Sequence, residues 1–244
     1  MITKNVTNKI LLQYNNGKNE EINYSKVFIT GENNIIKIKC CDKNAGLEIL
    51  EHIKIDITGF NNIIELDNIH LMKHNRLADY GFSIPALQIF IGGAANHLVD
   101  PNEIRYCNNS IVKIGDNSTF AGVTMYLQDS NSSVNIGKNC MFSYGIDVWC
   151  SDIHTIINFD GKPLNRGKFI EIGNHVWVGK DVKIGKNTKI SSDSVIGWAS
   201  VVTKEFDEIN VVIAGNPAKI VKRNIKWNAR DIENYEKHFN KGDI

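Results

Sequence analysis

A histidine and an aspartate two residues apart are the side chains in this sequence best suited to acid–base chemistry. Asp152 and His154 lie in the stretch CSDIHTIINFDGKPLNRGKF (150–169). A neutral imidazole accepts a proton near neutral pH, and a general base of this kind contributes about 10²–10⁴-fold in rate. Asp152 either orients the imidazole and stabilises its protonated form, or holds the substrate, or lies solvated in a turn. The pair therefore predicts a general-base site.

A six-residue repeat follows this stretch. A small or turn-forming residue follows each aliphatic position of the repeat. A helix requires apolar spacings of three and four, and a meandering strand requires simple alternation, so neither template fits. A short extended segment with a tight turn does fit, and three of them close a triangular coil that stacks on its neighbour at about 4.8 Å. The repeated residues are Ile172, Val178, Ile184, Ile190, Ile196 and Val202.

The same phase continues upstream with one insertion. The step from Ile114 to Ile136 is 22 residues, which is one coil of eighteen plus four residues near 129–132. Three similar stretches, GENNIIKI (31–38), GFNNIIEL (59–66) and CNNSIVKI (107–114), predict an irregular β-helical N-terminal part. The upstream core positions expected from the count are Ile114, Phe120, Tyr126, Ile136, Phe142 and Val148.

The count of six breaks after Val148. It would place His154, Asp160 and Arg166 at core positions, and each charged residue buried there would cost several kcal/mol, on the order of 5. We therefore expect residues 155–169 to leave the coil as an extruded loop, with His154 at the base of a cleft.

The fold class predicted is mainly β: a left-handed parallel β-helix of hexapeptide repeats with an irregular β-rich N-terminal part and a C-terminal α-helix. The expected divisions are 1–105, an extension of the β-helix; 106–223, the regular β-helix with its loop; and 224–244, an amphipathic helix packed on the prism or on a neighbouring subunit. The helix prediction depends on Ile225, Ile232, Tyr235 and Phe239, which lie near helical spacing. The left hand comes from the resemblance described next.

The hexads of 172–207, followed by VVIAGNPAKIVKR (211–223), resemble the hexapeptide-repeat acyltransferases, in particular the galactoside, maltose and polysialic acid O-acetyltransferases. The resemblance covers residues 106–223. It implies a left-handed β-helix, a homotrimer with active sites between subunits, and acetyl-CoA in the cleft between adjacent prisms. It also implies that His154 is the base in direct acetyl transfer, without an acyl-enzyme.

The resemblance assigns further residues to the site. Trp177 matches the tryptophan that lines the acetyl end of the cleft. Trp198 departs from the family, which has a small residue there, so it either stacks on a substrate or narrows the cleft. Phosphates are contacted by Lys and Arg in proteins. The residues expected to bind the coenzyme are Gly179, Gly197, Ala199, Lys204, Pro217, Lys219 and Arg223.

Composition and residue spacing also bear on nucleic acid, membranes and metal ions as partners, and on the cellular location of the protein. Lys plus Arg number 28 and Asp plus Glu 27, and no run of like charge stands out. The sequence therefore offers no basic segment that would bind nucleic-acid phosphates and gain affinity by releasing their counterions. The sequence predicts no signal peptide and no membrane span. Its five cysteines show no CxxC spacing, which favours reduced thiols and a cytoplasmic protein. Too few histidines lie in the repeat to form a three-histidine metal site, so no metal is expected.

The function predicted from sequence is acetyl-CoA-dependent O-acetylation of a sugar hydroxyl, in a bacterial surface polysaccharide such as capsule or O-antigen, or in its precursor. One alternative is N-acetylation of an amino-sugar nucleotide. Residues 1–105 lack a glycine-rich phosphate loop of the dinucleotide type, which disfavours it. The other alternative is a β-helix that binds carbohydrate without catalysis.

Overall fold

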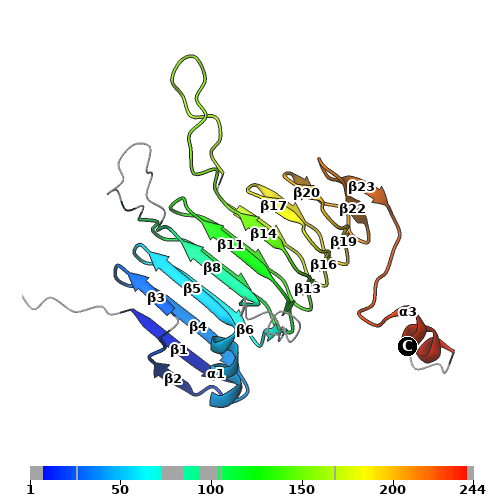
Figure 1. Ribbon diagram of the computed structural model, residues 1–244, viewed down its shortest axis with the longest axis horizontal. Helices are drawn as coiled ribbons and strands as arrows, with labels where there is room; N and C mark the ends of the chain where they lie inside the picture. The colour runs from blue at the N-terminus through cyan, green and yellow to red at the C-terminus, as the bar shows by residue number, and fades with distance from the viewer. Residues whose placement is uncertain are drawn as a thin grey trace, which may run out of the picture.

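The computed structural model describes residues 8–25, 27–72, 85–93, 104, 106–167 and 169–240. Within these residues the chain winds into a prism whose three sides are β-sheets, here named A, B and C, with a long loop and a terminal helix projecting from it (Figure 1). The chain visits the sheets in the order A, C, B. The prism therefore has an A–C edge, a C–B edge and a B–A edge.

Each sheet is a stack of hydrogen-bonded strands. Sheet A contains, in spatial order, β2 (Asn19–Ile22), β1 (Lys9–Tyr14), β4 (Ile35–Cys40), β6 (Ile63–Asp67), β9 (Ile111–Ile114), β12 (Ser133–Ile136), β15 (Phe169–Ile172), β18 (Thr188–Ile190) and β21 (Glu205–Phe206). Sheet B contains β3 (Val27–Thr30), β5 (Ile53–Thr58), β8 (Leu87–Ile91), β11 (Val123–Leu127), β14 (Ile146–Trp149), β17 (Lys183–Gly185) and β20 (Val201–Val202). Sheet C contains β7 (His70–Leu71), β10 (Thr119–Phe120), β13 (Met141–Phe142), β16 (Trp177–Val178), β19 (Val195–Ile196), β22 (Val212–Ala214) and β23 (Lys219–Lys222). Pairing is parallel except between β1 and β2 and between β22 and β23.

The six-residue repeat fills the prism as predicted. The residues at its aliphatic positions, from Ile172 to Val202, are at most 3% exposed. A second inward row accompanies them, so each side of a coil buries two residues rather than the single one expected. Where that second residue is a hydroxyl, it bonds to a backbone carbonyl, as Thr188 Oγ1 does to Val202 (3.2 Å) and Ser200 Oγ to Gly197 (2.7 Å). These bonds satisfy polar groups that would otherwise be costly to bury.

The expected core position at Tyr126 is wrong by one residue. Met125 is fully buried and pairs in register with Val148, whereas Tyr126 faces outward. The interval from Phe120 to Met125 is five residues, because this turn is one residue shorter than the turn after Phe142. Tyr126 instead stacks between Phe90 and Trp149 on the outer face of sheet B, with ring centroids 5.3 and 4.3 Å apart.

The three asparagine-containing stretches form successive rungs of sheet A, since Ile35, Ile63 and Ile111 are in register. Inside the turns that precede these strands, Asn34 and Asn62 are fully buried. Asn62 Nδ2 donates to Asn34 Oδ1 (2.9 Å), and Asn62 Oδ1 accepts from the Ser110 amide (2.9 Å). This ladder of buried amides joins one coil to the next, so the N-terminal part continues the β-helix.

Two helices complete the described residues. Helix α1 (Lys43–Glu51) takes the place of a sheet C strand between β4 and β5, and the Asp42 side chain caps it by accepting from the Ala45 amide (2.9 Å). Helix α3 (Ile232–Phe239) is shorter than the segment 224–244 predicted from sequence, and it stands away from the prism (Figure 1). None of its residues is buried. Residues 241–244 of the predicted segment lie outside the described residues.

Candidate active site

His154 lies at the B–A edge, where the chain leaves the prism after β14. Cys150 and Ser151 are buried, and Ser151 Oγ accepts from the Ile153 amide (2.8 Å). Ile153 has φ of 63°, a left-handed conformation that costs a β-branched residue on the order of 1–3 kcal/mol. This sharp turn points the chain outward, and the His154 side chain is exposed. Residues 151–167 then form the long loop above β14 in Figure 1.

A clasp of three polar side chains closes the base of this loop. Asn165 Nδ2 donates to the His154 carbonyl and to Asp152 Oδ2, both at 2.8 Å, and Asn165 Oδ1 accepts from the Ile156 amide (2.9 Å). Lys186, from the next coil, pairs with Asp152 (2.5 Å) and donates to the Asn165 carbonyl. The clasp fixes the backbone of His154 between the two arms of the loop.

The clasp also sets the charge of Asp152. Partial burial acts to raise the pKa of Asp152, but hydrogen bonds from Lys186 and Asn165, with the charge of Lys186, outweigh it and leave the pKa below its usual value. Asp152 is therefore ionised at neutral pH. Within the described residues, the groups bonded to its carboxylate are Lys186 and Asn165, so the structure uses Asp152 to hold the loop.

A polar hollow of about 410 Å³ surrounds His154. One wall comes from Asp129, Ser130 and Asn131, the turn that carries the four-residue insertion in the coil below. The other wall comes from the returning arm of the loop, including Asn165 and Arg166. A hollow with amide, hydroxyl and charged groups beside an exposed imidazole can bind and deprotonate a hydroxyl group.

Trp177 lies on sheet C, away from the B–A edge. It faces outward in β16, and its ring lies 6.1 Å from that of Trp227, between centroids. Trp227 comes from the segment after β23; it stacks on His175 at 4.1 Å and donates from Nε1 to the His175 carbonyl (2.9 Å). His175 is in turn bonded to Asp193 (2.9 Å). These contacts fix the chain that leads to α3 against the prism.

Trp198 lies at the C–B edge and is 74% exposed. It lies over Gly179 of the coil below, where a Cβ would approach Trp198 Cδ1 to 2.8 Å. Ala199 adopts φ of 52° in the same turn, and a Cβ on Gly197 would meet the Ala214 methyl at 3.0 Å. The small residues predicted to flank the coenzyme thus lie together at this edge, with the indole standing out from them.

Three of the basic residues predicted to bind the coenzyme line one hollow of about 440 Å³ at the C-terminal end of the prism. These are Lys204, Lys219 and Arg223. Arg223 is paired with Glu208 through two bonds of 2.6 and 3.0 Å, which raise the pKa of the guanidinium and lower that of the carboxyl group. Lys204 lies 5.2 Å from the ring centroid of Phe206. Pro217 is exposed in the turn between β22 and β23.

The predicted site residues therefore form separate groups within one chain. His154 and Asp152 lie at the B–A edge, while Trp198 and its glycines lie at the C–B edge, on the opposite side of sheet B. A single prism does not bring the imidazole and the two tryptophans together.

Asn165, Lys186 and Trp227 were missed by the sequence reasoning. Lys186 follows β17 at the same edge at which His154 follows β14, and β14 and β17 pair directly, so a count of coils could have placed Lys186 above the loop. Asn165 and Trp227 lie outside the repeat. Their positions carry no periodic signal.

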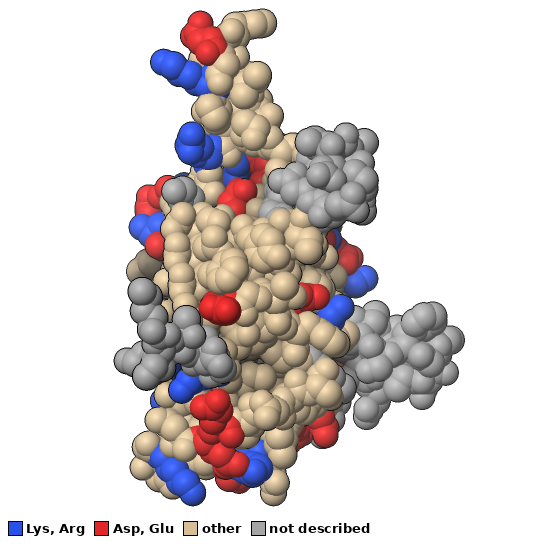
Figure 2. Space-filling model, turned by 90° about the vertical axis from the view of Figure 1, so that its left-hand side faces the viewer, with Lys and Arg blue, Asp and Glu red and all other residues tan. Residues whose placement is uncertain are grey.

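Other features of the described residues bear on the class of protein. No group of three His, Cys, Asp or Glu among them could hold a metal ion, and no described helix is long and apolar enough to cross a membrane. The five cysteines are free, and Cys41 is the exposed one. At the N-terminal end of the prism, acidic and basic side chains are intermixed (Figure 2).

Comparison with known proteins agrees with this fold. No family model matches the chain. The crystal structure of the polySia specific acetyltransferase NeuO superposes with a TM-score of 0.59 at 27% identity, covering 84% of this chain and 73% of NeuO. The polysialic acid O-acetyltransferase OatWY gives a TM-score of 0.54 at 21% identity, covering 98% of this chain and 99% of OatWY.

A curated sequence is also similar over part of the chain. It is named an uncharacterized 24.8 kDa protein in the cps region of Klebsiella pneumoniae, and it is 49% identical over 98 residues. The match covers 40% of this chain and 43% of the relative, so it spans less than half of that protein's length.

The stacked six-residue coils, the long loop after β14 and the similarity to NeuO together define the class of protein. The fold is a left-handed parallel β-helix. The fold and the similarity to NeuO agree with the resemblance to the hexapeptide-repeat acyltransferases that the repeat and the AGNPAK turn had predicted.

Proposed function

We propose that this protein is an O-acetyltransferase that transfers the acetyl group of acetyl-CoA to a sugar hydroxyl. The observation that carries the proposal is the placement of His154, an exposed imidazole in a polar hollow at the base of a clasped loop. The similarity to NeuO, an acetyltransferase specific for polySia, supports the reaction class.

His154 acts as the general base in this proposal. One imidazole nitrogen takes the proton of the sugar hydroxyl while the hydroxyl oxygen attacks the carbonyl carbon of the thioester. The tetrahedral intermediate then collapses as the C–S bond breaks, and the proton passes to the leaving sulfur of coenzyme A. The clasp formed by Asn165, Asp152 and Lys186 keeps His154 at the mouth of the hollow, so these three are positioning residues.

The residues of the C–B edge and of the C-terminal hollow fit the donor substrate. The indole of Trp198 is 74% exposed and rests against Gly179, so it offers a flat surface for adenine or pantetheine beside the small residues Gly197 and Ala199. Lys204 and Lys219 can contact phosphate groups. Arg223 would first have to release Glu208. Trp177 is assigned to the acetyl end of the same cleft.

We also propose a homotrimer with active sites between subunits. In one chain, sheet B separates His154 from Trp198, so a second copy is needed to bring a donor site next to the base. The exposed apolar side chains of the loop support such a contact. They are Ile156, Ile157, Phe159 and Leu164, of which Phe159 is fully exposed.

The acceptor in this proposal is a surface polysaccharide or its precursor. The relative from Klebsiella pneumoniae carries in its name a cps region, that is, a region of capsule genes, and NeuO acts on polySia. We place the reaction in the cytoplasm, where acetyl-CoA is supplied, and assign no metal to it.

Product analysis tests this function. Purified protein is incubated with acetyl-CoA and, separately, free sugars, sugar nucleotides and bacterial polysaccharides, and each product is examined by mass spectrometry. We expect an added acetyl group on a sugar hydroxyl. Acetylation of an amino group, or no product with any acceptor, would contradict the proposal. Light scattering of the same preparation should report a trimer, and a monomer that transfers acetyl would contradict the shared site.

A further inference from the structure

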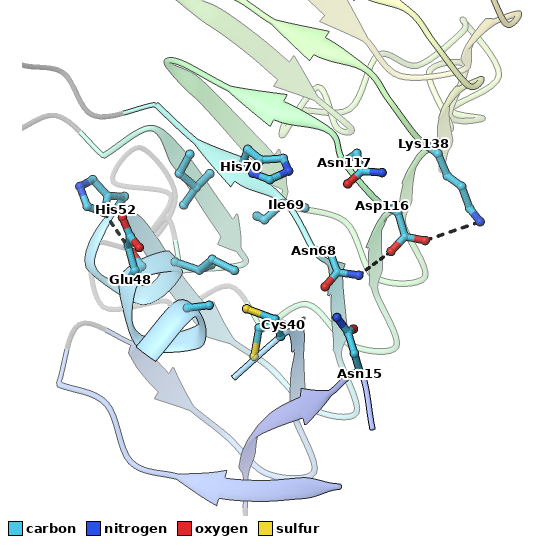
Figure 3. Close-up of a pocket in the computed structure, with 14 residues that line it drawn as sticks. Asn15, Cys40, Glu48, His52, Asn68, Ile69, His70, Asp116, Asn117 and Lys138 are labelled. Atoms are coloured by element: carbon cyan, nitrogen blue, oxygen red, sulfur yellow. Dashed lines mark hydrogen bonds and ion pairs between the residues drawn. The ribbon is translucent and has the colours of Figure 1, made fainter. Parts of the chain in front are cut away.

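A second hollow, of about 680 Å³, lies at the A–C edge in the N-terminal coils, apart from the His154 site. It exists because α1 replaces a sheet C strand between β4 and β5, so sheet C begins only at β7. The space between α1 and β7 is left open, and Figure 3 shows side chains from both elements and from the A–C turns around it. Its volume falls in the range of sites that bind small molecules.

The floor of this hollow is aliphatic. Ile49 of α1 is 9% exposed, and Ile69, beside β7, is 4% exposed. Leu71 and Ala45 are partly buried and complete the surface. Such a floor can contact the C–H groups of a sugar ring.

One wall is a pre-oriented hydrogen-bonding group. Asn68 Nδ2 donates to Asp116 Oδ1 (2.7 Å), and Lys39 and Lys138 lie 3.8 and 3.6 Å from the same carboxylate. The bond from Asn68 and the charges of both lysines lower the pKa of Asp116 in spite of some burial, so this acceptor stays ionised. Its geometry is fixed before any ligand binds.

The rim of the hollow carries further polar groups that are available to a ligand. The side chains of Asn15, Asn117 and His70 are exposed and, within the described part of the chain, form no hydrogen bond. His52 uses Nδ1 on the Glu48 carbonyl (3.0 Å), which leaves Nε2 for a ligand. Amide and imidazole groups can each donate and accept, which suits hydroxyl groups.

The charges around the hollow are mixed and largely paired. Lys39 and Lys138 share the carboxylate of Asp116 instead of forming a cluster of free cations, so the hollow is poorly suited to a phosphate. No described group of residues there could hold a metal ion. We propose that this hollow binds an uncharged sugar unit of the acceptor polysaccharide, with Asp116, Asn117 and His70 on its hydroxyls.

The hollow is placed to anchor a polymer whose reacting hydroxyl is at His154. Lys138, at its rim, belongs to the same coil as His154, and the sheet A strand of that coil, β12, joins the two edges. A four-residue strand spans about 13 Å. The outer face between the edges carries small groups, Ser133, Asn135 and Gly137. This anchoring role rests on the function proposed above, whereas sugar binding by the hollow does not.

Calorimetric titration of the full-length protein with maltohexaose, hexa-N-acetylchitohexaose and a sialic acid hexamer tests the inference in the absence of acetyl-CoA. Ala45→Phe fills the hollow from α1, and its matched control, Asn44→Phe, places the same ring on the neighbouring exposed position. His70→Ala removes a rim group without adding bulk, with Thr119→Ala, the paired residue of the next coil, as its control.

We expect an uncharged hexasaccharide to bind, and its Kd to rise about tenfold or more in Ala45→Phe and in His70→Ala but not in either control. Binding of none of the three sugars, binding of the sialic acid hexamer alone, or equal binding by Ala45→Phe would overturn the inference. A protein that binds the hexasaccharide at this hollow but transfers no acetyl group would contradict only the proposed function.

Discussion

Replacement of Asn165 by alanine should loosen the clasp that positions His154. The change removes three hydrogen bonds, to the His154 carbonyl, to Asp152 Oδ2 and from the Ile156 amide. Each such bond contributes about 0.5–1.5 kcal/mol. Because these groups are exposed and water replaces part of each bond, we expect a net loss of about 1–2 kcal/mol in the closed loop. If the closed loop is the competent state, kcat/KM should fall about 5- to 30-fold.

The assay is steady-state acetyl transfer with the acceptor found by mass spectrometry, together with hydrogen exchange of residues 151–167. Asn158→Ala is the matched control. It removes bonds from the Asp160 and Lys162 amides near the tip of the same loop, away from His154. Faster exchange at the loop base should accompany the loss of activity in Asn165→Ala alone. Wild-type kinetics in Asn165→Ala, or an equal loss in Asn158→Ala, would refute the positioning role.

The stability of the clasp should also depend on pH, and the ionisation of Asp152 sets the direction of that dependence. Its pKa in the folded protein lies below the unfolded value. The stabilisation is therefore complete above the unfolded pKa, near 4, and is lost as the pH falls through the folded pKa. The difference in loop exchange between Asn165→Ala and wild type should be largest at neutral pH and should narrow in acid, where the bonds of Asn165 to the His154 carbonyl and the Ile156 amide remain. A difference that does not change with pH would contradict the role of Asp152.

Two further predictions concern the prism itself. Asn62→Ala removes three buried bonds, from Nδ2 to Asn34 Oδ1 and to the Cys107 carbonyl and from the Ser110 amide to Oδ1. The free energy of unfolding in urea should therefore fall by about 3–6 kcal/mol, compared with little change in the exposed control Asn44→Ala. Equal stability of the two variants would refute the ladder. A thiol reagent at about pH 8 should modify the exposed Cys41 rapidly and spare Cys140 and Cys150. Burial raises the pKa of each of these two thiols to about 11, so neither is ionised at that pH. Rapid reaction of Cys140 in the folded protein would contradict the packing.

The regular coils were predictable because aliphatic residues such as Ile172 and Ile190 recur every six positions, and the equivalent residues of adjacent coils are their packing partners. The register at Tyr126 could not be predicted, because a turn shorter by one residue makes Met125 face inward in place of Tyr126 and leaves no mark in the composition. The edge position of His154 followed from the cost of burying Asp160 and Arg166. The clasp could not be derived in the same way, because Asn165 and Lys186 contact Asp152 only when the loop has left the prism and returned to it. The hollow between α1 and β7 was missed because a helix replaces a strand there, and that substitution breaks the repeat.

The most direct test of the central claim is the acetyl-transfer rate of purified His154→Ala beside His238→Ala, a control in α3, the helix that stands away from the prism (Figure 1). If His154 is the general base, the first variant should fold, bind acetyl-CoA as the wild type does, and lose about 10²–10⁴-fold in kcat, while the control keeps the wild-type rate. A His154→Ala protein that transfers acetyl groups at the wild-type rate would show that the base lies elsewhere.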